Sequence, residues 1–263
     1  MAQKFSIREV VERSLDFTYF DGPITAKYWP GAYNNRLLVV TGDNASGKSF
    51  FGKLFSGLAR SEEYGKIEIM RLSMQLRTSQ GIEKAFVFGD ESYRPTGAIS
   101  ANTVRTGIST CRGRTSDHII FFDEPDIGLA ESYQGALGKL IASFAQDLPD
   151  KTRALCVVTH SRRIVRHLAP LNPHYLRIGD ELPIEDFLKE APDKDIGDLD
   201  KLAEVAQTRF GAIQDCINEG KRERAKEAAL EKAKTEKKRG KKAKGSDCCD
   251  REGDDPDDSG WEW

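Results

Sequence analysis

Residues 37–49 of this 263-residue chain are Leu37-Leu38-Val39-Val40-Thr41-Gly42-Asp43-Asn44-Ala45-Ser46-Gly47-Lys48-Ser49. The apolar run up to Thr41 favours a buried strand, and the residues after it fit the phosphate-loop pattern G-x-x-x-x-G-K-S. The glycines let backbone N–H groups face phosphates, and a helix expected over 48–58 adds its positive N-terminal end. We expect Gly42 to Ser49 to bind ATP, with Lys48 on the β- and γ-phosphates and Ser49 on Mg²⁺. A chance match in a glycine-containing loop is the alternative.

Two acidic residues end a second apolar run. Ile119 to Phe122 is followed directly by Asp123, Glu124 and Pro125. Ligands bind at the carboxyl ends of parallel strands, so these acids and the phosphate loop are expected to meet at one edge of a sheet. We predict that Asp123 holds Mg²⁺, directly or through water, and that Glu124 orients or deprotonates the attacking water. The alternative is that both acids only cap the turn before Pro125.

A histidine follows a third apolar run, Leu155 to Val158 and then Thr159. At this position His160 can point to the same edge and donate to a γ-phosphate or hold the water, so we predict a functional role for it. The remaining histidines have no such position and are expected to be structural or exposed; they are His118, His167 and His174.

Strand-like and helix-like segments alternate along the chain, and no internal repeat is evident. This order predicts an α/β fold of three layers, in which helices cover a mostly parallel sheet. The expected strands are 36–41, 67–70, 84–88, 118–122, 154–159 and 175–178. The expected helices are 48–58, one from about Ser100, 130–145, a short one after Ser161 and one after Gly197.

Three of these segments, in this order, resemble the motifs of an ATP-binding cassette (ABC) type ATPase. GDNASGKS, IIFFDEPDIGL and VVTHS look like Walker A, Walker B with the D-loop, and the H-switch, within about residues 36–165. The resemblance implies a P-loop NTPase fold, ATP and Mg²⁺ as ligands, and two nucleotide domains that close head to tail around ATP. It also implies that Glu124 is the catalytic base and that His160 senses the γ-phosphate.

The family's signature segment starts a helix that contacts the partner's γ-phosphate. Its best match is Ile99 to Thr103, where Ser100 keeps the serine and Ala101 and Asn102 replace two glycines. The resemblance therefore implies that Ser100 binds nucleotide in trans through a degenerate signature. An ordinary helix N-cap is the alternative, because serine is favoured there.

Two further departures from the family concern the neighbouring loops. Ala130 stands where the D-loop acid is usual. The candidate Q-loop glutamines, Gln75 and Gln80, lie so close to Ser100 that only a reduced helical subdomain fits between them, which disfavours a transporter. An aromatic residue that stacks on adenine should lie before the phosphate loop, and four candidates stay open: Tyr19, Phe20, Tyr28 and Trp29.

Charge is segregated near the C-terminal end, although the net charge is only −2. Residues 221–244 hold twelve Lys and Arg against four Glu, and residues 247–263 hold eight acidic residues against one Arg. Blocks of like charge stay solvated and often act as interaction tails. We therefore expect an ABC-type ATPase domain over 1–219 and a disordered charged tail over 220–263.

The sequence also indicates where in the cell the protein is expected. The longest apolar runs are strand-sized, the first residues lack a secretion signal, and the five cysteines form no C-x-x-C pair. We expect a soluble, cytoplasmic protein with no membrane insertion and no zinc site.

Two functions follow from these features. The leading hypothesis is a Mg²⁺-dependent ATPase that couples nucleotide state to closure of an ATP-dependent homodimer or to remodelling of a partner. The alternative is a nucleotide-gated module that binds nucleic acid, or a protein partner, through the basic stretch 221–244, and a purely solvated tail stays open beside it. A phosphate-loop kinase is disfavoured, because Asp123, Glu124 and His160 would then lack a purpose.

Overall fold

The computed structural model describes residues 5–17, 19–20, 24–32, 35–73, 96–189 and 199–243. The chain divides into two compact units, Met1–Ile213 and Gln214–Trp263. The first unit contains a six-stranded sheet with the strand order β1-β6-β2-β5-β4-β3. The expected α/β class with a mostly parallel sheet is therefore confirmed. Within the described residues, no helix is long and apolar enough to cross a membrane.

The strands of the sheet are β1 (Ala26–Trp29), β2 (Leu37–Gly42), β3 (Glu68–Ser73), β4 (His118–Asp123), β5 (Thr152–Val158) and β6 (His174–Ile178). All neighbours from β6 across to β3 pair in parallel, and β1 pairs antiparallel with β6 at one edge. Sequence periodicity did not predict β1, because its four residues mix small, charged and aromatic side chains. The β2–β5 register sets Val39 opposite Val157, which aligns the carboxyl ends of these strands.

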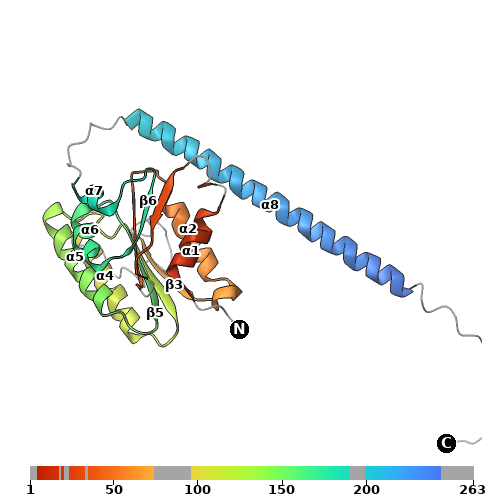
Figure 1. The fold of residues 1–263 in the computed structure, drawn as a ribbon, viewed down its shortest axis with the longest axis horizontal. Coiled ribbons are helices and arrows are strands. Elements are labelled where there is room, and N and C mark those ends of the chain that lie inside the picture. The colour runs from red at the N-terminus through yellow and green to blue at the C-terminus, as the bar shows by residue number, and fades with distance from the viewer. Residues whose placement is uncertain are drawn as a thin grey trace, which may run out of the picture. The chain divides into compact units, whose positions relative to one another are not determined.

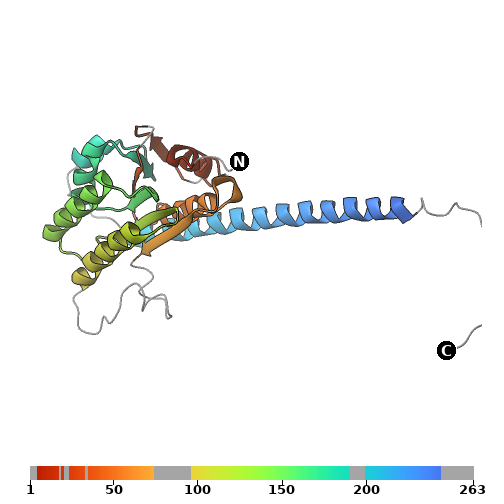
Figure 2. The same ribbon diagram turned by 90° about the horizontal axis from the view of Figure 1, so that it is seen from below.

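Helices cover both faces of the sheet (Figures 1 and 2). Those of the first unit are α1 (Ile7–Leu15), α2 (Lys48–Ala59), α4 (Thr96–Gly113), α5 (Glu131–Gln146), α6 (Arg162–Leu168) and α7 (Ile184–Lys189), with the 3-10 turns η1 (Glu62–Tyr64) and η3 (Ala169–Leu171). α1 and α2 lie on one side, and α4, α5 and α6 lie on the other (Figure 1). The central strands β2, β4 and β5 therefore bury both of their faces, which explains why they are nearly continuous apolar runs rather than alternating ones.

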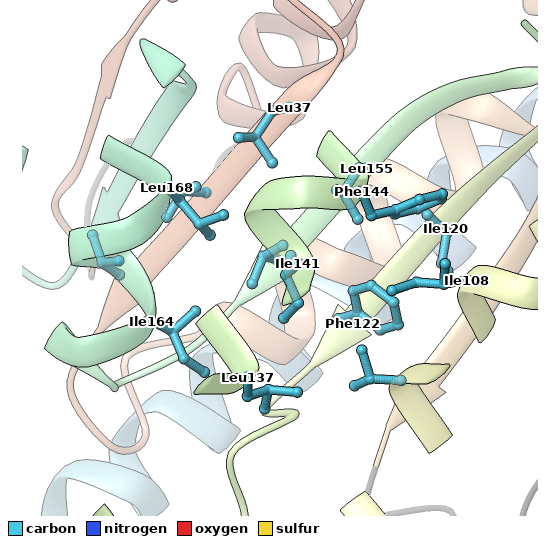
Figure 3. Packing of buried hydrophobic residues seen from close by; sticks show 14 of the residues in the cluster. Leu37, Ile108, Ile120, Phe122, Leu137, Ile141, Phe144, Leu155, Ile164 and Leu168 are labelled. Atoms are coloured by element: carbon cyan, nitrogen blue, oxygen red, sulfur yellow. The ribbon is translucent and has the colours of Figure 1, made fainter. Parts of the chain in front are cut away.

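Alternate residues of each strand feed two apolar cores. In β4, Ile120 and Phe122 pack in the cluster that α4, α5 and α6 close, together with Leu137 and Ile141 (Figure 3). The intervening Phe121 turns to the α2 side, where its ring lies 6.4 Å from that of Phe55. This two-sided packing fixes the register of the central strands, because a slip of one residue would exchange the two faces.

Two boundaries differ from the expected ones by three residues or more. α4 already includes Thr96, whereas its start was expected near Ser100. β3 extends to Ser73, beyond the expected end at Met70, and so includes Arg71. The expected strand 84–88, Gln75 and Gln80 lie outside the described residues, and so does the segment in which a reduced helical subdomain was expected.

The second unit carries most of α8 (Leu199–Ala243). Helix continues through residues 220–243, where we expected disorder, and the reason is composition: Ala, Glu, Lys and Arg are the strongest helix formers. Residues 221–230 are all exposed, so this part of the helix buries no apolar face. The acidic stretch 247–263 lies outside the described residues.

Candidate functional site

Three adjacent parallel strands bring the predicted residues to one edge of the sheet. The phosphate loop follows β2, Asp123 ends β4, and Thr159 and His160 follow β5, which lies between the other two strands. Parallel strands present their carboxyl ends at the same edge, so the tertiary structure gathers segments that are far apart in the sequence.

The backbone of the phosphate loop needs its glycines for two different reasons. A Cβ on Gly42 would lie 2.4 Å from the Ile178 carbonyl oxygen, so the loop can press against the end of β6 only with glycine there. Gly47 has a φ of 102°, which other residues rarely adopt, and α2 starts directly after it. Ala45 also lies in the left-handed region, with a φ of 57°, at a cost of roughly 1–2 kcal/mol.

Lys48 is buried at the first position of α2 and curls over the loop. Its Nζ donates to the carbonyl oxygens of Gly42 at 2.9 Å and Asp43 at 2.8 Å. Burial lowers the pKa of this ammonium to about 8, against the opposing effect of the negative charges of Glu124 and Asp43. The side chain is thus held at the loop, with its charge state sensitive to what binds there.

Glu124 and His160 form a direct pair. Nε2 of His160 lies 2.9 Å from Oε1 of Glu124. The hydrogen bond with His160 holds the pKa of the Glu124 carboxyl below its usual value, against the opposing effect of burial, and the charge of Lys48 acts in the same direction as His160. Glu124 has a φ of 52°, and backbone strain of this kind in a non-glycine residue clusters at functional sites.

A second layer supports this pair. Oγ1 of Thr159 donates to Oδ1 of Asp126 at 2.7 Å and accepts from the backbone N–H of Ser161 at 2.9 Å. Ser161 in turn caps α6 by accepting from the N–H of Ile164. The turns that carry Glu124 and His160 are therefore tied to each other, which fixes the position of both side chains.

Ser100 contacts the turn that follows β4. It is buried in α4, and its hydroxyl donates to the carbonyl oxygens of Ile127 at 2.6 Å and Thr96 at 3.2 Å. It lies one turn inside the helix rather than at its N-cap, and it does not line the pocket at the phosphate loop. The structure thus brings together residues 42–49, Asp123, Glu124 and His160, and it holds Ser100 inside α4 against the turn after β4.

A pocket of about 410 Å³ opens at the phosphate loop, within the size range of small-molecule sites. Glu124 and Tyr19 line it, as do the loop and the first-unit part of α8, where Arg209 donates to the Ala45 carbonyl at 2.7 Å. Of the four aromatic candidates for adenine, Tyr19 alone is at this pocket; Tyr28 instead bonds to His174, and Trp29 stacks near Tyr175. The full lining is Tyr19, Asn44, Ala45, Ser46, Gly47, Lys48, Ser49, Phe50, Glu124, Ala206, Arg209, Phe210 and Ile213.

Two arginines at the site were missed from the sequence. Arg177 of β6 is buried, bonds both oxygens of Asp180 at 2.7 and 2.5 Å, and reaches Oδ1 of Asp43 in the phosphate loop at 3.2 Å. Arg71 of β3 bonds Oδ2 of Asp123 at 2.5 Å. The signal that could have found Arg177 is a single charged residue inside β6, because a buried charge needs a partner. Arg71 gives no such signal, because Glu68 is also charged in β3 and the expected strand ended at Met70.

The donor set at this edge fits Mg²⁺ better than a transition metal. It offers the Asp123 carboxylate and the Ser49 hydroxyl, and the described residues hold no cluster of three or more His, Cys, Asp or Glu. Mg²⁺ is bound in this way, through one or two carboxylates together with substrate phosphates and waters.

No protein-family model matches this chain, and no curated protein matches its sequence significantly.

Proposed function

We propose that this chain is an ABC-type ATPase that binds ATP with Mg²⁺ at the phosphate loop and hydrolyses it. The observation that carries the proposal is the convergence of a phosphate loop, a buried aspartate and a Glu–His pair at the ends of three neighbouring parallel strands. A fortuitous G-x-x-x-x-G-K-S match would not require an acid and a histidine at the same edge, tied together at 2.9 Å.

Each residue has a task in this proposal. The N–H groups of Asn44 to Gly47 and the positive end of α2 bind the phosphates, and Lys48 leaves the loop carbonyls to pair with the β- and γ-phosphates. Asp123 and Ser49 hold Mg²⁺, which neutralises the charge on the phosphate oxygens.

Glu124 and His160 act on the water. Glu124 accepts a proton from the attacking water while the water oxygen forms a bond to the γ-phosphorus and the bond to the β–γ bridging oxygen breaks, which gives ADP and phosphate. The lowered pKa keeps Glu124 ionised near neutral pH, so its carboxylate is in the form that can accept a proton. His160 orients Glu124 through their hydrogen bond and can donate to the γ-phosphate.

The test is ATP turnover by the wild-type chain and by Glu124→Gln. The amide keeps the size and the hydrogen-bonding capacity toward His160 but cannot accept a proton, so turnover should fall by roughly 10²–10⁴-fold. ATP affinity should change little, because the interaction is needed in the transition state and not in the ground state. Equal turnover by both proteins rules out Glu124 as the base.

The same variant tests the proposed homodimer. In the proposed homodimer, two chains close head to tail around unhydrolysed ATP. The Glu124→Gln variant should therefore sediment as a dimer with Mg²⁺ and ATP, and as a monomer without ATP. Ser100→Ala on this background examines the trans contact. An unchanged dimer there indicates that Ser100 has only the packing role suggested by its bond to Ile127.

A further inference from the structure

Arg71 and Asp123 form an ion pair at the predicted metal position. Nη2 of Arg71 lies 2.5 Å from Oδ2 of Asp123, and the aspartate side chain is only 3% exposed. Charged groups in such a place are costly unless they are paired, so Arg71 is the group that allows Asp123 to be buried as an anion.

The surroundings of Arg71 hold its guanidinium at this place. It lies over the ring of Phe121, 5.2 Å from the centroid. Gly52 of α2 lies against both groups, because a Cβ there would be 3.0 Å from Cζ of Phe121 and 3.4 Å from Nη2 of Arg71. A side chain at position 52 would press on Phe121, so the glycine leaves room for the ring over which the guanidinium lies.

The pair conflicts with metal binding at the same carboxylate. A divalent cation and a guanidinium that share one carboxylate repel each other strongly in a site with little water. Mg²⁺ also demands near-ideal octahedral geometry around its oxygen ligands, which leaves little freedom for Asp123 to serve both.

We propose that Arg71 is a positioning residue that sets the metal affinity of this site by exchange. It neutralises and orients Asp123 until nucleotide and metal arrive, and it then gives up Oδ2 of Asp123. Metal therefore binds Asp123 only at the expense of the Arg71–Asp123 ion pair. This inference rests on the proposed function, because it assigns Asp123 to the metal.

The experiment is a titration with Mn²⁺ at one equivalent of ADP, followed by the loss of the free-ion electron paramagnetic resonance signal, with the Mn²⁺ bound by ADP alone measured in a protein-free blank and subtracted. Arg71→Met keeps the length of the side chain and its contact with Phe121 but removes the competing charge. Its Mn²⁺ affinity should exceed that of the wild type by roughly ten- to a hundredfold, the factor that corresponds to one hydrogen bond between charged groups. Arg71→Lys keeps the charge without the planar guanidinium, so its Mn²⁺ affinity should lie between those of the wild type and Arg71→Met.

The chain offers a matched control. Arg153 of β5 makes a similar ion pair, with Nη2 2.6 Å from Oδ2 of Asp117, but at the opposite ends of the strands. Arg153→Met should leave the Mn²⁺ affinity at the wild-type value.

The outcomes separate the two proposals. Mn²⁺ affinity that is unchanged or weaker in a folded Arg71→Met protein overturns the exchange and leaves the proposed function intact. If Arg71→Met does not fold, as judged by its circular dichroism spectrum, Arg71→Lys takes its place. Mn²⁺ affinity of a folded Arg71→Lys protein that is unchanged or weaker than that of the wild type then overturns the exchange. A wild-type chain that binds neither ADP nor Mn²⁺ with ADP overturns the proposed function together with the role of Arg71.

Discussion

Raising the pH from about 7 to about 9.5 is expected to weaken nucleotide binding through one group, Lys48. Burial lowers the pKa of this ammonium to about 8 in the structure, whereas an exposed lysine titrates near 10.4. Bound phosphates favour the charged form, so the pKa of Lys48 in the complex lies above that in the free chain. Above pH 8 the free chain must therefore take up a proton in order to bind, and affinity falls as the pH rises.

The size of the effect follows from the two protonation states. With a pKa of about 8 in the free chain, Lys48 is charged in most molecules at neutral pH and in only a few per cent near pH 9.5. If the complex stays protonated throughout, the dissociation constant for ADP rises about 30-fold over this interval, close to tenfold per pH unit at its upper end. Phosphate groups are already ionised across the range, so they add no opposing change.

Isothermal titration calorimetry with ADP in two buffers of different ionisation enthalpy measures both the affinity and the proton uptake. Lys53→Arg is the control, since it makes a lysine-to-arginine change on the same helix, outside the residues that line the pocket, and its pH profile should match the wild type. In Lys48→Arg the guanidinium does not titrate, so any remaining affinity should be independent of pH. A wild-type dissociation constant that stays constant from neutral pH to about 9.5 refutes the reasoning.

Two further predictions concern the support of the phosphate loop and the charged helix. Asp180→Asn should destabilise the first unit by about 2–3 kcal/mol, because it leaves the buried Arg177 charge without its main partner, whereas Arg177→Met leaves only a part-exposed carboxylate and should cost about 1 kcal/mol. Urea unfolding measures the free energy of unfolding of both variants. A larger loss of stability in Arg177→Met than in Asp180→Asn would contradict the idea that the buried Arg177 charge depends on Asp180. Truncation after Glu219 should leave ADP affinity unchanged, because the phosphate loop and the Glu124–His160 pair lie in the first unit. The same truncation should remove the nucleic-acid binding proposed for the twelve Lys and Arg of residues 221–244. Fluorescence anisotropy with duplex DNA at low and moderate salt tests this binding, since phosphate-driven binding weakens steeply with salt. Equal DNA affinities of the full-length and the truncated chain would show that the tail has no such role.

The central part of the fold was predictable because its strands are buried on both faces. Runs such as Ile119 to Phe122 and Leu155 to Val158 leave no other placement for so much apolar surface, and their polar ends mark the edge of the candidate site. β1 was not predictable, because a short edge strand is held by backbone pairing with β6 rather than by a pattern of its own. The helix over 220–243 was missed for the opposite reason: absence of an apolar face suggested disorder, while intrinsic propensity favoured helix.

The sequence by itself determined which residue types stand at the ends of the strands: the glycine-containing segment 42–49 at the end of β2, two acids at the end of β4 and a histidine after β5. These positions depend on local rules, namely glycine conformation, apolar runs and the polar or turn-forming residues that end them. Only the tertiary structure decided which of these residues meet. The strand order sets β5 beside β4, β3 beside β4 and β6 beside β2, which brings His160 to Glu124, Arg71 to Asp123 and Arg177 to Asp43. Ser100 is buried in α4, where it bonds to Ile127. The first three pairings join residues 36 to 134 positions apart, and no local pattern encodes them because they arise only when the sheet assembles.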